Sequence, residues 1–225
     1  MVTSKMPEPD EPVDDGPGTD TSPTHDILQR DERRADARHM TVLQIGKLVT
    51  ARQQMLCLVR NISAGGAKIY ALRSLAIDER LRIEFRSGAA AEGAVMWTEG
   101  NIAGIRFDHA IDILRLLGAG KSATPDVQLP RHPRLEIRAS AKVEWEGKTF
   151  PAEVLNISQT GVCLELEPGL LPHQSVSLKI EGLPFTLARV VWKKGNQAGL
   201  AFSQSLAYEA LGHWVMDRPA RVLLR

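Results

Sequence analysis

The chain has 225 residues, 43% of them hydrophobic and 24% charged, and its formal net charge is +1. This length fits one large or two small globular domains, and two is the better expectation. Residues 1–30 carry seven acidic residues against Lys5 and Arg30, so the remaining 195 residues carry a net charge of +6. Such a mildly basic body suits a small anionic ligand. It lacks the basic stripe typical of duplex binders, so we expect no nucleic-acid polymer as a partner.

The composition also restricts location and cofactors. No run of 18 apolar residues occurs, and the N-terminus is acidic rather than basic and then apolar. We therefore expect no membrane insertion, no secretory signal and a cytoplasmic location. The two cysteines, Cys57 and Cys163, lie far apart without a CxxC or a histidine-rich neighbourhood. They predict buried thiols rather than a disulfide or a metal site.

The N-terminal segment has two parts. Residues 1–26 are mostly Pro, Asp, Glu, Gly, Ser and Thr, which cannot bury enough apolar surface to offset the entropy of ordering, so we expect a disordered acidic tail. Residues 27–38 are densely charged and are compatible with a short helix or an extended arm. Taken alone, such a charge run is most often a solvated linker.

Short runs of alternating apolar and polar residues, separated by brief polar turns, predict strands through the next region. The predicted strands are 41–50, 54–59, 67–72, 81–86, 93–97 and 103–107. Many short strands of this kind indicate a small antiparallel barrel or sandwich. A helix is expected from Asp108, which can cap it, to about Leu117, because Ile111, Leu114 and Leu117 recur at helical spacing.

The same order of elements then repeats. Asn61-Ile62-Ser63 recurs at Asn156-Ile157-Ser158, and the blocks 94–97 and 100–107 align with 189–192 and 195–202, all at an offset of 95 residues. One offset through separate blocks indicates a duplicated domain rather than a solenoid, which would need at least three units. The second copy predicts a hairpin from 139–145 and 149–155 and a helix over about 206–216.

The repeat defines the expected organisation. The predicted parts are an acidic tail at 1–26, a first domain with its arginine arm at 27–118, a linker at 119–130 and a second domain at 131–225. The string Gly118-Ala119-Gly120-Lys121-Ser122 mimics the end of a phosphate-binding loop. Arg115 stands where that motif needs its first glycine, and the string follows a helix rather than a strand, so we do not expect a nucleotide hydrolase.

Two motifs in the first copy carry the chemistry. Arg33, Arg34 and Arg38 form an RRxxxR segment, and guanidiniums hold phosphates and guanine edges in bidentate fashion. An NxSxxG segment follows about two dozen residues later, with Asn61, Ser63 and Gly66 as its fixed positions. Short polar side chains and glycines permit close approach of a ligand to the backbone. Each motif alone is common, and NxSxxG alone is often a plain turn.

The two motifs together, in this order and spacing, resemble those of the PilZ domain, a bacterial receptor for cyclic di-GMP. The VxW and G[IL]xF strings of both copies are similar to the late strands of that family. The resemblance implies a mainly β chain of two tandem antiparallel β-barrels, each followed by a C-terminal α-helix. It implies that Arg33, Arg34 and Arg38 clamp the ligand over a floor of Asn61, Ser63 and Gly66. It implies no cofactor beyond this ligand, and ordering of the arm on binding that signals to a downstream protein partner.

The second copy departs from the motif pattern. Arg134 lies 22 residues before Asn156, close to the 23 from Arg38 to Asn61, whereas Pro130 falls where Arg34 stands. Arg138 would complete a literal RxxxR, but from inside a strand. We therefore expect a weakened or reshaped second site, for which the candidate residues are Arg131, Arg134, Asn156, Ser158 and Gly161.

The sequence also bears on three other functions. Members of the family with incomplete arginines act as ligand-independent adaptors, and the second copy is the candidate for that role. A single-stranded nucleic-acid binder would need exposed aromatic side chains, whereas Trp97, Trp145, Trp192 and Trp214 occupy apolar positions that predict the core. The six histidines are scattered and no nucleophile motif occurs, so we expect no enzyme.

Overall fold

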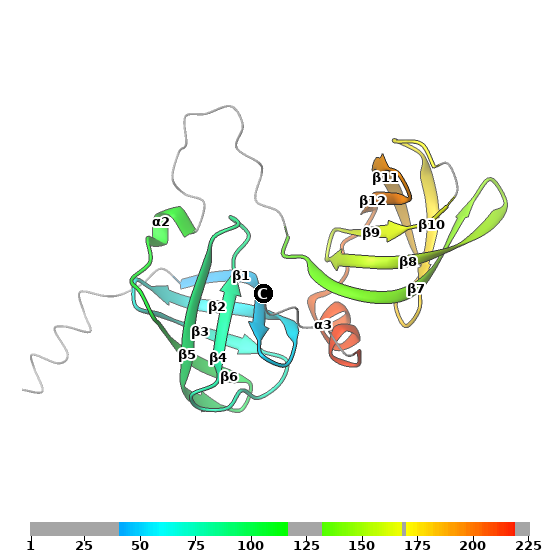
Figure 1. Cartoon of the computed structure of the whole chain (residues 1–225). Helices are drawn as coiled ribbons and strands as arrows, with labels where there is room; N and C mark the ends of the chain where they lie inside the picture. The colour runs from blue at the N-terminus through cyan, green and yellow to red at the C-terminus, as the bar shows by residue number, and fades with distance from the viewer. Residues whose placement is uncertain (1–40, 117–131, 168–169, 219–225) are drawn as a thin grey trace, which may run out of the picture. The chain divides into compact units, whose positions relative to one another are not determined.

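The structure is a computed structural model that describes residues 41–116, 132–167 and 170–218. These residues form two closed antiparallel β-barrels of six strands each, which confirms the predicted fold class (Figure 1). None of the helices in these ranges is long and apolar enough to cross a membrane. The predicted tail at 1–26, the arginine arm and the whole of the predicted linker at 119–130 lie outside the described residues.

The first barrel has the strand order β1-β2-β3-β6-β5-β4. Its strands are β1 (Thr41–Thr50), β2 (Gln54–Ser63), β3 (Gly66–Ala71), β4 (Arg80–Glu84), β5 (Ala90–Glu99) and β6 (Ile102–Phe107). Alternation along each strand turns one set of side chains into the barrel, where Ile69, Ile83 and Val95 are fully buried. Closure of the sheet leaves no unpaired edge.

The second barrel has the equivalent strand order, β10-β11-β12-β9-β8-β7. Its strands are β7 (Leu135–Trp145), β8 (Lys148–Ser158), β9 (Gly161–Glu165), β10 (Ser175–Ile180), β11 (Thr186–Lys194) and β12 (Gln197–Phe202). The fully buried side chains Val143, Leu164 and Val190 mark its core. Because the order and pairing match those of the first barrel, the offset of 95 residues reflects a duplicated fold.

Bulges occur at matching places in the two barrels. The register shifts between Val59 and Asn61 in β2, and between Val95 and Trp97 in β5. The second barrel has the same shifts just before Asn156 in β8 and before Trp192 in β11. A bulge places two residues opposite one and re-aims the side chains beside it. Both the NxSxxG segment and the VxW tryptophan therefore follow a bulge.

Both helices begin later than predicted. Within the described residues the helix after the first barrel, α2, is the single turn Ile113–Leu116, so its predicted start at Asp108 is wrong. The backbone amides of Asp108 and Ile111 instead donate to the carbonyls of Glu92 and Ala64, which ties this segment to the barrel. The second helix, α3 (Tyr208–Met216), begins two residues after the predicted start.

The predicted state of the cysteines is confirmed, since Cys57 and Cys163 are free and buried. Burial raises the pKa of the Cys57 thiol to about 12 and also raises the pKa of Cys163. Both sulfurs therefore remain protonated at neutral pH and are poor nucleophiles. No group of three or more His, Cys, Asp or Glu in the described ranges is arranged to hold a metal ion.

Candidate functional site

The NxSxxG segment of the first barrel is the end of β2 and its tight connection to β3. Asn61 and Ser63 lie in the strand, which runs to Ser63 and so extends four residues beyond its predicted end at 59. The Ser63 hydroxyl donates to the carbonyl of Gly66 at 3.1 Å and closes the turn. A Cβ at Gly66 would lie 2.3 Å from the carbonyl oxygen of Ile105, so β6 approaches too closely for any other residue. The glycine is thus required by strand packing.

A cavity of about 350 Å³ lies over this segment and gathers the predicted residues Asn61, Ser63 and Gly66. Its walls come from β2, β3, β5 and β6, and beyond the motif they include Lys68, Met96, Trp97, Gly104 and Arg106. This volume is within the range of small-molecule sites. The described lining contains two cations and no carboxylate, so the cavity favours an anion.

Trp97 forms one side of this cavity. Trp97 pairs with Gly104 across β5 and β6, and Lys68 pairs with Gly104 on its other side. A Cβ at Gly104 would lie 2.0 Å from Nε1 of Trp97, so the indole rests directly on the glycine. The Lys68 ammonium lies 5.6 Å from the centre of the ring, within the range of a cation–π contact. Glycine at this position gives the indole its place on the sheet.

Trp97 is 42% exposed and Trp192 is 39% exposed, so their predicted place in the core is wrong. Trp214 is buried as predicted. The outward turn follows from the bulges before Trp97 and Trp192, which break the in–out alternation on which the prediction depended. The sequence carries a signal of this arrangement, because each exposed tryptophan pairs with a glycine seven residues later in the chain, Gly104 or Gly199.

The remaining cations of the first-barrel site are Lys68 and Arg106, which sequence reasoning missed. Lys68 projects from the outer face of β3, and Arg106 is exposed on β6 beside Gly66. Only their positions in the sheet identify them, since each pairs with a glycine of the site on a neighbouring strand. The predicted clamp residues Arg33, Arg34 and Arg38 lie outside the described residues, so the structure does not place them against this cavity.

In the second barrel the structure brings together only some of the predicted site residues. Arg134 donates to the side-chain oxygen of Asn156 at 2.6 Å, so the structure brings these two motif positions together. Ser158 donates to the carbonyl of Gly161 at 3.2 Å, as in the first barrel, but its side chain is buried. Arg131 lies outside the described residues. Arg138 lies within β7, as expected.

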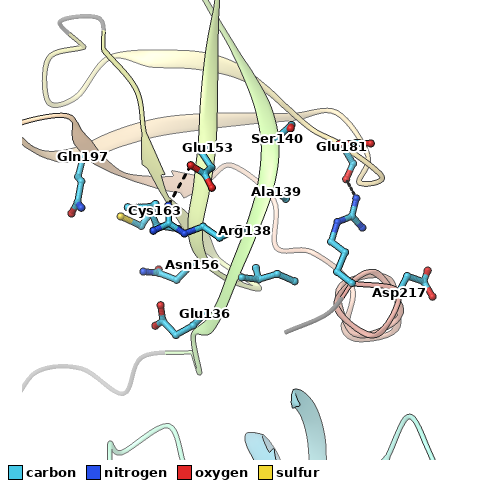
Figure 2. A pocket seen from close by; sticks show the side chains of 13 residues that line it. Glu136, Arg138, Ala139, Ser140, Glu153, Asn156, Cys163, Glu181, Gln197 and Asp217 are labelled. Atoms are coloured by element: carbon cyan, nitrogen blue, oxygen red, sulfur yellow. Dashed lines mark hydrogen bonds and ion pairs between the residues drawn. The ribbon is translucent and has the colours of Figure 1, made fainter. Parts of the chain in front are cut away.

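The cavity beside Asn156 differs in chemistry from that of the first barrel. It has a volume of about 1210 Å³ and includes Asn156 but neither Ser158 nor Gly161. Figure 2 shows Arg138 reaching toward Glu153, an ion pair of 3.3 Å, with Asn156 and Cys163 beside it. Four carboxylates and two guanidiniums line the cavity, namely Glu136, Glu153, Glu181, Asp217, Arg138 and Arg218. This excess of negative charge disfavours an anion.

The positions of the two barrels that correspond by sequence explain this difference. Lys68 corresponds to Cys163, and Arg106 corresponds to Ala201. The second barrel has a cation at Arg189, which pairs with Ala201 and is therefore one strand further from the glycine of the NxSxxG segment. The backbone of the site is repeated, whereas its positive charge is not.

Comparison with known proteins supports the duplication. The family model described as PilZ domain matches twice, over residues 30–118 and 128–216. No curated protein matches. Similar solved structures include PlzA of Borreliella burgdorferi in complex with c-di-GMP, at 11% identity and a TM-score of 0.35, covering 84% of this chain and 98% of that chain.

Two further solved structures are similar. The inhibitor of motility MotI/DgrA of Bacillus subtilis has 15% identity and a TM-score of 0.33, covering 80% of this chain and 97% of that chain. YcgR of Escherichia coli in complex with c-di-GMP has 13% identity and a TM-score of 0.29, with 85% of each chain covered. On the family match to both halves, this chain belongs to the PilZ domain family.

Proposed function

We propose that this protein is a non-catalytic receptor for cyclic di-GMP whose ligand site is on the first barrel. In this proposal Arg33, Arg34 and Arg38 clamp the phosphates and guanine edges, and Asn61, Ser63 and Gly66 form the floor. Membership of the PilZ domain family supports the class of ligand. The family match begins at residue 30 and therefore includes the arginine segment.

One observation carries the proposal. The cavity over the NxSxxG segment has Lys68 and Arg106 in its walls, has no carboxylate in its described lining, and exposes the indole of Trp97. A cyclic dinucleotide presents two phosphates and two purine rings. Cations pair with phosphates, and an exposed indole provides a stacking surface for a purine. The side chains around this cavity therefore complement both parts of the ligand.

The proposed signal is the ordering of the arginine segment when the ligand binds. Arginines on a segment that contacts the ligand become fixed when it binds, and the energy comes from guanidinium contacts that exist only in the bound state. In this account the linker between the barrels is fixed at the same time, which changes the surface offered to a protein partner.

A second function, ligand-independent protein binding, is favoured for the second barrel alone. Its cavity beside Asn156 is lined mainly by carboxylates, and Arg138 is held by Glu153 and Glu165 at 3.3 and 3.9 Å. An arginine paired in this way must break its ion pairs before it can bind a phosphate. The second barrel is therefore the candidate adaptor, for pilus, flagellar or polysaccharide machinery.

Calorimetric titration of cyclic di-GMP into the full chain tests the proposal, with GTP as the ligand control. We expect saturable binding that Arg34→Ala abolishes and Arg134→Ala largely retains. Loss of binding in Arg134→Ala with retention in Arg34→Ala would assign the site to the second barrel. Absence of binding heat and of thermal stabilisation at high ligand concentration would overturn the receptor.

A further inference from the structure

The outer face of the second barrel carries a row of exposed apolar side chains along β11. We define the β11 stripe as Phe185, Leu187, Val191 and Trp192, which are 61%, 55%, 54% and 39% exposed. Leu187 and Val191 are four residues apart in β11, so they project from the same face of the strand, and Phe185 immediately precedes its first residue. The bulge before Trp192 turns that side chain to the same side.

The first barrel lacks this stripe. The corresponding positions are Ala90, Glu92, Met96 and Trp97, so alanine and glutamate stand where the second barrel has phenylalanine and leucine. Both barrels have the same strand order, so closure of the barrel does not require large apolar side chains at these positions. A row of exposed apolar side chains on only one of two equivalent faces indicates an interaction surface.

The charged side chains of β10, β11 and β12 have one sign. Strands β10, β11 and β12 contain no acidic residue, and their four cations are Lys179, Arg189, Lys193 and Lys194. Arg189 lies within the row, between Leu187 and Val191. Leu178 pairs with Thr186, and Lys179 and Phe185 each stand one residue beyond that last pair. Lys194 is two residues beyond Trp192. From Phe185 to Lys194 the row is about 30 Å long at 3.3 Å per residue.

We propose that this face of β10, β11 and β12 docks an acidic amphipathic segment of a partner protein. Its apolar side chains cover the β11 stripe, and its carboxylates pair with Lys179, Arg189 and Lys194. The inference deepens the relay to a protein partner proposed above, and rests on it. A row 30 Å long matches a helix of about 20 residues, at 1.5 Å per residue.

Charge and position favour this occupant over three others. A second copy of this face would bring cations against cations, because these strands hold no carboxylate. The acidic residues 1–26 of this chain contain few apolar side chains to cover the stripe. A bilayer that accepts Leu187 and Val191 would also have to accept Arg189 between them, and burying that cation in hydrocarbon is costly.

Selection from a displayed library of random 20-residue peptides on the immobilised full chain tests the proposal. The Leu187→Glu variant serves for counter-selection, since it installs the residue that the first barrel has at Glu92. Leu187 is more than half exposed, so the variant keeps its fold, which circular dichroism checks. We expect selected peptides that are acidic and carry spaced Leu, Ile or Phe. A synthetic copy of a selected peptide should bind at least tenfold more weakly to Leu187→Glu and to Arg189→Glu than to the wild type. Its affinity for Glu92→Leu should equal that for the wild type.

Several results would overturn the proposal. These are no enriched peptide, neutral or basic peptides, or binding that Leu187→Glu and Arg189→Glu leave unchanged. Leu187-dependent sedimentation with phosphatidylglycerol vesicles would assign the face to a membrane instead. A Leu187-dependent oligomer would assign it to a second copy, and peptide binding that appears only after removal of residues 1–26 would assign it to that segment. Calorimetry with cyclic di-GMP tests the nucleotide site separately. Failure of the peptide-binding proposal and failure of the receptor proposal can therefore be distinguished.

Discussion

The two barrels share a backbone and differ in the side chains on its outer face. Each has the same strand order, register shifts at the same places and a tryptophan lying on a glycine, Trp97 on Gly104 and Trp192 on Gly199. In the first barrel this frame displays Lys68 and Arg106 around a cavity lined without carboxylates. In the second it displays apolar side chains along β11. The fold supplies the geometry, and a few exposed residues decide which ligand that geometry suits.

The largest expected effect concerns the cations that only the first barrel has. Lys68→Ala combined with Arg106→Ala should weaken cyclic di-GMP binding at least about a hundredfold, because a hydrogen bond to a charged group contributes about 1.5–3 kcal/mol. Calorimetry measures the effect. Arg189→Ala, on the equivalent face of the second barrel, is the matched control and should leave affinity unchanged. A greater loss of cyclic di-GMP affinity in Arg189→Ala than in the double variant would assign the nucleotide site to the second barrel.

The exposed tryptophans give the next effect. Trp97→Ala should weaken binding about tenfold or more, since stacking of a base on an aromatic side chain contributes about 1–3 kcal/mol. Trp192→Ala should leave nucleotide affinity unchanged and weaken binding of the peptides selected on the β11 stripe. Equal nucleotide affinities for the two variants would show that neither indole, or both, contact the ligand.

The glycines beneath the tryptophans test the part that the barrels share. A Cβ at Gly104 or Gly199 would lie 2.0 Å from the Nε1 of its tryptophan, so alanine at either position must displace the indole. We expect Gly104→Ala and Gly199→Ala each to destabilise the protein by about 1–3 kcal/mol in urea unfolding. Only Gly104→Ala should reduce nucleotide affinity. A neutral effect of both on stability would contradict the role assigned to these glycines.

The smallest effect concerns an ion pair confined to the first barrel. Arg80 donates to the carboxylate of Asp108 at 2.8 Å, whereas Ser175 and Ser203 occupy the corresponding positions. The hydrogen bond from Arg80 holds the pKa of Asp108 below its ordinary value. The stabilisation that the ion pair gives the folded protein is therefore present above about pH 3.9, the pKa of an unfolded aspartate. It is lost as the pH falls through the lowered pKa of Asp108 in the folded protein.

Thermal unfolding of Asp108→Asn as a function of pH checks this assignment. We expect a slightly lower midpoint than that of the wild type at pH 7, with the difference shrinking as the pH falls below about 3.9. The pair is exposed to solvent, so the shift should be small. A difference that stays constant with pH would show that the charge of Asp108 contributes nothing.

Much of the fold could be predicted from the sequence, because the alternation of apolar and polar residues and the turn residues are local features of the chain. The repeat also shows the pattern of the strands in two copies. The short α2 could not be predicted this way, because Asp108 and Ile111 donate to carbonyls of other barrel segments rather than to the next helical turn. The pattern of Ile111, Leu114 and Leu117 is helical, but tertiary hydrogen bonds delay the start of the helix.

The candidate site was predicted in part for a similar reason. The spacing of the motifs pointed to Asn61, Ser63 and Gly66, which the structure gathers at one cavity. Trp97 and Arg106 were missed, because the bulge in β5 changes which side chains face out, and because cross-strand neighbours are distant in sequence. Local patterns identify a motif, whereas strand register decides what surrounds it.

The most direct test of the central claim is an NMR titration of the full chain with cyclic di-GMP, following the indole N–H signals of its tryptophans. Trp97→Phe and Trp192→Phe assign the two signals that matter. If the first barrel holds the nucleotide, the Trp97 signal shifts with saturation while the Trp192 signal stays in place. A saturable shift of Trp192 with Trp97 unmoved, or no shift of either, would contradict the account.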